Sequence, residues 1–168
     1  MFLFGDLQPC TALEPVIFSD TTTLILVSMP GMESLREKFY FMDTDSCFWP
    51  LMALIYRMPI LNKEDKLKLL QQNHLGIWSI IKSCLRYKSR DDTLEDIVLN
   101  DMQPFLAHYP NIKRILCTSH EAMRLLQEAD PKAALLASYV PTPSKYDLWF
   151  ESVEKLVPEY KKALDLVS

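Results

Sequence analysis

The sequence predicts an α/β protein, a three-layer α/β/α sandwich with a four-stranded, mainly parallel sheet at its centre. Two observations lead to this prediction. Short, uninterrupted apolar runs, of which residues 24–27 are the clearest, are typical of strands buried on both faces of a sheet. These runs alternate with longer segments whose apolar residues recur at helical spacing, which is typical of parallel sheets built from strand-helix-strand units.

The first predicted strand ends in a sharp turn. Residues 24–27 run into residues 28–31, where Pro30 removes a backbone donor and Gly31 permits a tight turn. A first helix is expected over residues 33–38. A strand, a turn and a helix in this order commonly place a ligand at the carboxyl end of a parallel strand.

The remaining elements are predicted from apolar spacing, capping residues and helix breakers. Further helices are expected over residues 48–57, 62–73 with Asn62 as cap, 94–98 beginning at Asp92-Thr93, 102–108, and 119–126 with Ser119 as cap. Further strands are expected over residues 75–81, 112–117 and 133–139. Finally, Ser144 is expected to cap a long amphipathic helix that Pro158 kinks or divides and that buries Trp149, Phe150, Val153, Leu156 and Val157.

Composition favours a soluble globular protein. The 168 residues are expected to form one domain over residues 1–168, with residues 1–14 as a loosely packed lead-in. The apolar fraction is 49% and the charged fraction 24%. No apolar run is long enough to span a bilayer and no leader pattern precedes the first strand, so we expect a cytoplasmic protein that does not bind membranes. We also expect a monomer.

Net charge and cysteine spacing limit the partners and cofactors that the sequence predicts. The net charge of −4 gives no overall attraction to nucleic acid. The densest cationic patch consists of Lys82, Arg86, Lys88 and Arg90. This patch either contacts phosphates or is a solvated helix end and loop. The four cysteines occur singly, without the Cys-x-x-Cys spacing of zinc or iron-sulfur sites, so no metal and no cofactor are predicted.

A longer pattern resembles a known family. Leu24-Ile25-Leu26, Ser28-Met29-Pro30-Gly31, Ser34-Leu35, Phe39-Tyr40 and Phe48-Trp49 together resemble the opening of the hypoxanthine (deoxyinosine) DNA glycosylases, members of the uracil-DNA glycosylase superfamily. Similar segments follow in the expected order at Gly76-Ile77-Trp78, Cys84-x-Arg86, Ser89-x-Asp91, Pro110-x-Ile112 and Val140-Pro141-Thr142. The resemblance implies a four-stranded parallel core and the removal of a deaminated base from DNA.

The chain departs from the family pattern at positions that would carry the chemistry. Val27 stands where the relatives have a glycine, and Ser46 stands where they have their principal catalytic asparagine, after a one-residue insertion. A serine hydroxyl can hold a water but lacks the paired donor and acceptor of an amide. Similarly, Ser79 replaces an aspartate, and Thr118-Ser119 replaces an asparagine-glycine pair.

Site residues follow from the resemblance and from the predicted edge of the sheet. The candidates for positioning or activating water are Ser46, Asp45, Asp43 and Ser28. The expected base pocket consists of Val27, Met29, Pro30, Gly31, Phe48, Ser79, Thr118 and Ser119. The expected phosphate contacts are Pro141, Thr142, Ser144, Lys145, Arg86 and Lys88. Two alternatives stay open: the aspartates also fit a solvated loop, and Phe48 also fits a core.

Two hypotheses about function remain. In the first, the protein is a DNA glycosylase that removes hypoxanthine or uracil from damaged or single-stranded DNA. In the second, it is a catalytically degenerate member of the superfamily that binds nucleic acid, a nucleotide or a protein through the same edge. Ser46 and an aspartate beside Ser28 at this edge would favour the enzyme, whereas Val27 filling the pocket would argue against it.

Overall fold

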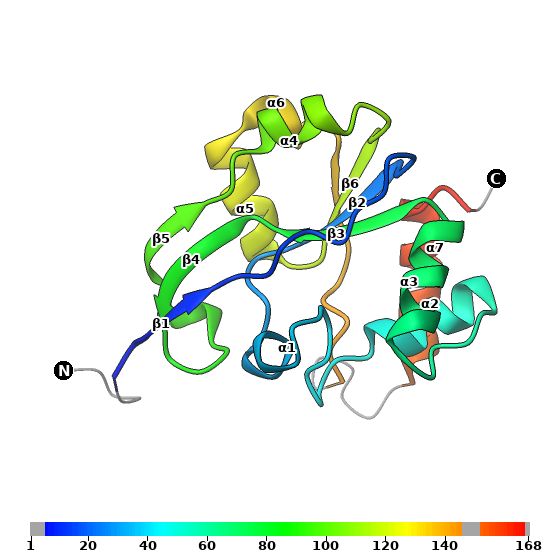
Figure 1. The fold of residues 1–168 in the computed structure, drawn as a ribbon, viewed down its shortest axis with the longest axis horizontal. Helices are drawn as coiled ribbons and strands as arrows, with labels where there is room; N and C mark the ends of the chain where they lie inside the picture. Colours follow the sequence, from blue (N-terminus) through cyan, green and yellow to red (C-terminus); the bar gives the residue numbers. More distant parts are fainter. Residues whose placement is uncertain (1–5, 146–151, 167–168) are drawn as a thin grey trace.

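A parallel sheet lies at the centre of the molecule. The computed structural model describes residues 6–145 and 152–166 (Figure 1). Strands β2 (Thr23–Val27), β3 (Leu75–Ser79), β6 (Arg114–Cys117) and β7 (Ala137–Tyr139) form a four-stranded sheet in the order β3-β2-β6-β7. Each neighbouring pair is parallel. The predicted sheet is therefore confirmed.

Helices cover both faces of this sheet, which gives the predicted three layers (Figure 1). One face packs against α2 (Phe48–Tyr56), α3 (Lys63–Gln72) and α7 (Val157–Ala163), and the other against α4 (Met102–His108) and α5 (His120–Ala129). Side chains alternate between the two faces of a strand. Along β2, Ile25 packs in the core on the side of α2, α3 and α7, whereas Leu24 and Leu26 pack in the core on the side of α4 and α5.

A second, antiparallel sheet was not predicted. It consists of β1 (Gln8–Thr11), β4 (Ile81–Arg86) and β5 (Glu95–Leu99) in the order β1-β4-β5. The expectation of a loose lead-in over residues 1–14 is wrong for β1, which pairs with β4 along its whole length. The expected helix over residues 94–98 is also wrong, because Ile97 and Leu99 alternate with exposed residues at the spacing of a strand.

Two predicted strand boundaries need correction. The strand expected over residues 75–81 ends at Ser79, and after Ile80 the chain enters β4 of the other sheet. The strand expected over residues 133–139 is confined to β7, because residues 133–134 belong to a short helix, α6 (Pro131–Ala134), which Asp130 caps. Two predicted caps are confirmed, since Asn62 caps α3 and Ser119 caps α5.

The predicted C-terminal helix lies only partly within the described residues. Ser144 forms an isolated β-bridge with Ser46, and residues 146–151, where the helix was expected to begin, lie outside the described ranges. A 3₁₀ turn, η2 (Val153–Leu156), leads into α7, and Pro158 lies in the first turn of α7, where a missing N–H costs nothing. The predicted core positions Trp149 and Phe150 lie outside the described residues. In the ranges that the structure describes, no helix has the length and apolar character needed to cross a membrane.

Short helix α1 (Met32–Glu37) follows β2 directly and confirms the first predicted helix. With η1 (Asp91–Thr93), which precedes β5, it lies near the carboxyl end of the parallel sheet. The loops at this end carry the polar residues singled out in the sequence.

Candidate functional site

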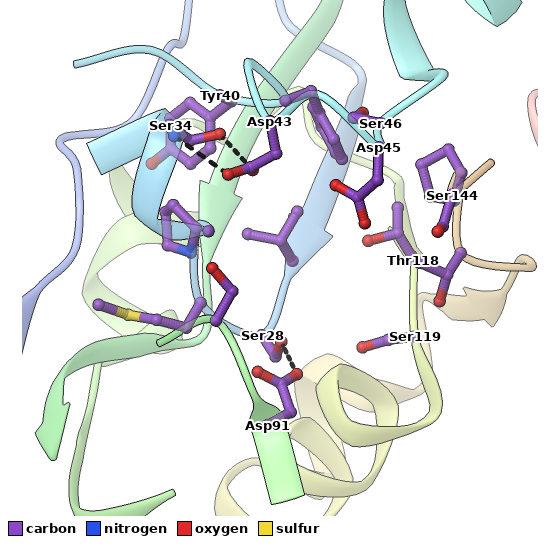
Figure 2. Close-up of a pocket in the computed structure, with 18 of the residues that line it drawn as sticks. Ser28, Ser34, Tyr40, Asp43, Asp45, Ser46, Asp91, Thr118, Ser119 and Ser144 are labelled. Atoms are coloured by element: carbon purple, nitrogen blue, oxygen red, sulfur yellow. Dashed lines mark hydrogen bonds between the residues drawn. The ribbon is translucent and has the colours of Figure 1, made fainter. Parts of the chain in front are cut away.

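A pocket of about 320 Å³ opens at the carboxyl end of the parallel sheet. Its walls come from the loops that follow β2, β4, β6 and β7, from helix α1 and from the segment between α1 and α2 (Figure 2). The predicted site residues that line it are Val27, Ser28, Met29, Pro30, Gly31, Asp43, Asp45, Ser46, Thr118, Ser119, Thr142 and Ser144. Although Val27 forms part of the wall, it leaves the cavity open. Ser28, Asp45 and Ser46 therefore border one cavity.

Backbone pairing between two loops fixes one side of the pocket. The Cys47 N–H donates to the Pro143 carbonyl at 2.8 Å, and the Lys145 N–H donates to the Asp45 carbonyl at 2.7 Å. Between these bonds, Ser46 bridges Ser144. The loop after β7 therefore holds Asp45 and Ser46 in place.

The carboxylate of Asp43 is committed to the structure of helix α1. It accepts the Glu33 N–H at 3.0 Å and the Ser34 N–H at 3.3 Å, and it also accepts the Ser34 hydroxyl at 2.7 Å. These N–H groups belong to the first turn of α1, where a carboxylate satisfies donors that have no partner within the helix. Asp43 thus lines the pocket mainly as a cap.

Gly31 makes this cap possible, which leads to a stability prediction. A β-carbon at Gly31 would lie 2.4 Å from both carboxylate oxygens of Asp43. Because the φ of Gly31 is −68°, alanine meets no backbone penalty there, and the effect comes from displacing Asp43. We expect Gly31→Ala to lower the free energy of unfolding by about 1–2 kcal/mol, the usual cost of a lost cap, in urea denaturation.

A double-mutant cycle checks the cause of that loss. If Gly31→Ala acts by displacing Asp43, the change in an Asp43→Ala background should be close to zero. Full additivity of the two substitutions would contradict this explanation.

Asp45 and Ser46 have different environments. Figure 2 shows the Asp45 carboxylate directed into the pocket near Thr118. The Ser46 hydroxyl accepts the Phe48 N–H at 3.3 Å, at the start of α2, and retains its own hydrogen as a donor. Thr118 is buried, and its hydroxyl donates to the Leu26 carbonyl at 3.5 Å.

One short polar contact in the pocket was not predicted from the sequence. The Ser28 hydroxyl donates to Oδ2 of Asp91 at 2.5 Å, although the two residues are 63 positions apart. Burial raises the pKa of Asp91, while the Ser28 hydrogen bond and the charge of Arg86 act in the opposite direction. The family-like segment Ser89-x-Asp91 was the available signal, and both of its named residues line the pocket.

The structure corrects two predicted pocket residues. Phe48 is fully buried and stacks on Phe41, with 3.8 Å between ring centroids and 12° between ring planes. Of these two rings, Phe41 is the one that lines the pocket. Ser79 is also fully buried, and its hydroxyl donates to the Ile81 carbonyl at 2.7 Å. Both residues are therefore parts of the core.

The predicted phosphate contacts divide into two groups. Thr142 and Ser144 line the pocket, while Lys145 and Lys88 are exposed on the loops beside it. Arg86 is only 1% exposed, so its guanidinium is not available to a phosphate. The carbonyl of Pro141 accepts the Tyr160 hydroxyl at 2.7 Å, and Pro141 does not line the pocket.

The lining of the pocket is acidic and rich in hydroxyl groups. Its four carboxylates are those of Glu33, Asp43, Asp45 and Asp91, and within the described ranges no lysine, arginine or histidine lines it. The Thr44 hydroxyl and N–H lower the pKa of Glu33, which keeps that carboxylate ionised. Among the residues that the structure describes, no three metal-ligating side chains are grouped closely enough to hold an ion. Such a lining suits a polar ligand that offers hydrogen-bond donors.

Two curated proteins are similar in sequence. The chain is 31% identical to a hypoxanthine DNA glycosylase of Methanosarcina barkeri and 32% identical to a hypoxanthine DNA glycosylase of Methanosarcina acetivorans, each over 104 residues. The matched segment is 61% of this chain and 66% and 65% of the two relatives, slightly less than two thirds of their length. No model of a known protein family matches the chain.

A solved structure has the same fold. It is the solution structure of a candidate uracil DNA glycosylase from Methanosarcina acetivorans, with a TM-score of 0.78 at 23% identity. The similarity covers 94% of this chain and 97% of the other. This chain is therefore similar in sequence to two hypoxanthine DNA glycosylases and shares its fold with a candidate uracil DNA glycosylase.

Proposed function

We propose that the protein is a DNA glycosylase that hydrolyses the N-glycosidic bond of a deaminated base, hypoxanthine or uracil, in DNA. The observation that carries this proposal is the convergence of Ser28, Asp45 and Ser46 on one open pocket at the carboxyl end of the sheet. The similarity to two hypoxanthine DNA glycosylases supports the same reaction.

The pocket has the size and lining that a single extruded base requires. Its volume of about 320 Å³ lies at the lower end of ligand pockets, which range over roughly 300–1,000 Å³. An extruded base is usually stacked on an aromatic side chain and read by hydrogen bonds to its edge. Phe41 supplies a ring in the wall, and the hydroxyl groups of Thr118 and Ser46 supply adaptable hydrogen bonds.

The partner proposed is DNA that contains a damaged base, in single-stranded or distorted form. An extruded base costs least to unpair in such DNA. We assign the contacts with flanking phosphates to Thr142 and Ser144, which line the pocket, and to Lys145 and Lys88, which are exposed. We further propose that the protein acts as a monomer in the cytoplasm.

Two observations favour a second candidate, a binding protein that has lost catalysis. Val27 stands in the pocket wall where the relatives have glycine, and the hydroxyl of Ser46 accepts the Phe48 N–H. A base would then bind without an amide to orient water.

Base release from oligonucleotides distinguishes the two candidates. Labelled strands would carry hypoxanthine, uracil or xanthine, and strand cleavage at abasic sites in alkali would report release. We expect the natural protein to release one or more of these bases, and Ser46→Ala to do so about tenfold more slowly, the effect of one lost polar contact.

The variant Ser46→Asn restores the relatives' residue and serves as the comparison. Release by Ser46→Asn without release by the natural protein would contradict the glycosylase and support the binding protein. If neither protein released a base or bound DNA at low salt, both candidates would fail.

A further inference from the structure

We propose that Asp91, oriented by Ser28, is the catalytic base that takes a proton from the attacking water. This inference rests on the proposed function, and it assigns the role to a residue outside the predicted catalytic set. Three features of the structure support it: the open oxygen of Asp91, the buried charge of Arg86, and the commitment of the competing carboxylate of Asp43.

The Ser28–Asp91 pair leaves a site for water. Oδ2 of Asp91 accepts the Ser28 hydroxyl at 2.5 Å, and the structure gives its Oδ1 no donor among the described residues. Because the Ser28 hydroxyl donates its hydrogen to Asp91, its oxygen can only accept a hydrogen bond from another group. Both residues line the pocket. A water there would donate one hydrogen to Asp91 and the other to Ser28, with its own lone pair directed at the substrate.

Arg86 supplies a buried positive charge that acts on Asp91. Its Nη2 donates to the Pro30 carbonyl at 2.8 Å, so Arg86 also holds the turn that follows Ser28. Its Nε and Nη1 are buried without a hydrogen-bond partner in the part of the chain that the structure describes. A buried cation is costly unless an anion is near, and Asp91 is the carboxylate whose pKa the charge of Arg86 lowers.

The surroundings of Asp91 tune its basicity. Burial raises its pKa, as do the charges of Glu121 from α5 and of Asp92 beside it, while Ser28 and Arg86 from β4 lower it. The net effect is a pKa above the usual value of 3.8, which makes Asp91 a stronger base than a solvated aspartate.

The other carboxylates are less suited to this role. Asp43 already accepts three hydrogen bonds from the start of α1. Asp45 lies near Thr118, at a different end of the pocket from the Ser28–Asp91 pair (Figure 2). Asp45 is placed to face the sugar or the base instead.

The proposed step conserves atoms and charge. The water oxygen forms a bond to C1′ of the deoxyribose while the bond from C1′ to the base nitrogen breaks. The electron pair of that bond leaves with the base, which takes up a proton from solvent. The proton of the water passes to Oδ1 of Asp91 and is later returned to solvent.

Single-turnover base release by Asp91→Asn is the direct test. Asparagine keeps the size of aspartate but cannot accept the proton, and loss of a general base typically slows a reaction by about 10²–10⁴-fold. We expect a loss of at least about 100-fold, with the Kd for a strand that carries hydrolysis-resistant 2′-fluoro-deoxyinosine changed less than about threefold. The matched control is Asp96→Asn, since Asp96 is exposed on β5, lies outside the pocket and is not among the charges that act on Asp91.

The pH dependence separates a catalytic role from a structural one. The natural enzyme should lose activity as the pH falls through the pKa of Asp91, because protonated Asp91 cannot accept a proton. Ser28→Ala removes a hydrogen bond that lowers this pKa. The acidic limb of its rate profile should therefore move to higher pH, and in Asp91→Asn it should be absent.

Each outcome decides between named alternatives. A natural protein that releases base, together with an Asp91→Asn variant that releases it within threefold of the same rate, overturns the inference but leaves the glycosylase intact. Loss in Asp45→Asn but not in Asp91→Asn transfers the role to Asp45. If the natural protein releases no base, the proposed function fails and this assignment fails with it. Melting temperatures of the variants identify any loss that comes from unfolding.

Discussion

Replacing Phe48 by alanine is expected to lower the free energy of unfolding by about 3–5 kcal/mol, the range typical of large aromatic residues in a core. Phe48 is fully buried at the start of α2, stacked on Phe41 and edge-on to Trp49 at 4.9 Å between centroids. Alanine leaves a cavity that these two rings cannot fill without moving. Urea denaturation followed by tryptophan fluorescence and circular dichroism measures the loss.

Leu61→Ala is the control for this prediction. Leu61 is 89% exposed, so its removal should change the free energy of unfolding by less than about 0.5 kcal/mol. A Phe48→Ala protein that kept its stability and lost only DNA binding would contradict the core assignment. It would restore the alternative in which Phe48 stacks on the base.

Phe48 was predicted to line the base pocket but lies in the core, which illustrates which features sequence patterns can predict. Short apolar runs and capping residues are local, so β2, α3 with its cap Asn62, and α5 with its cap Ser119 were predicted well. By contrast, a pattern of aromatic residues shows that some rings pack together but not which one borders a cavity. Phe41 and Phe48 stack on each other, and only the tertiary structure shows that Phe41 lines the pocket.

The second sheet was missed because its pairing is not local. Strand β1 pairs with β4 more than 70 positions later in the chain, as in the pairing of Gln8 with Arg86. The same sheet explains the error at Arg86. A basic residue in a charged segment is usually solvated, but β4 carries this side chain beneath the turn at Pro30.

The candidate site was predicted in part for the same reason. The carboxyl ends of parallel strands converge, so Ser28, Thr118 and Ser144 could be placed together from the order of the strands. Asp91 could not, because its position depends on the unpredicted strand β4 and on η1. A family-like segment such as Ser89-x-Asp91 that lacks an assigned role is therefore a useful indicator of a missing site residue.

Phe41→Ala is expected to weaken binding of a strand with hydrolysis-resistant 2′-fluoro-deoxyinosine by about tenfold or more, since base–aromatic stacking contributes roughly 1–3 kcal/mol per base. Phe41 has one ring face against Phe48, so only its other face or its edge can meet a ligand in the pocket. Its backbone is left-handed, with φ at 60°, a strained conformation that proteins tend to keep at functional sites. Fluorescence anisotropy at low salt measures the Kd.

Two further substitutions at this position separate stacking from packing. Phe41→Tyr keeps the flat ring and should bind within about threefold of the natural protein, whereas Phe41→Leu keeps apolar contact with Phe48 but has no aromatic face. If stacking is the cause, Phe41→Leu should bind nearly as weakly as Phe41→Ala while remaining more stable to urea. Equal binding by Phe41→Leu and the natural protein would mean that Phe41 only supports Phe48. The base would then have to be held by the hydroxyl groups around it, of which Thr118 and Ser46 line the same pocket.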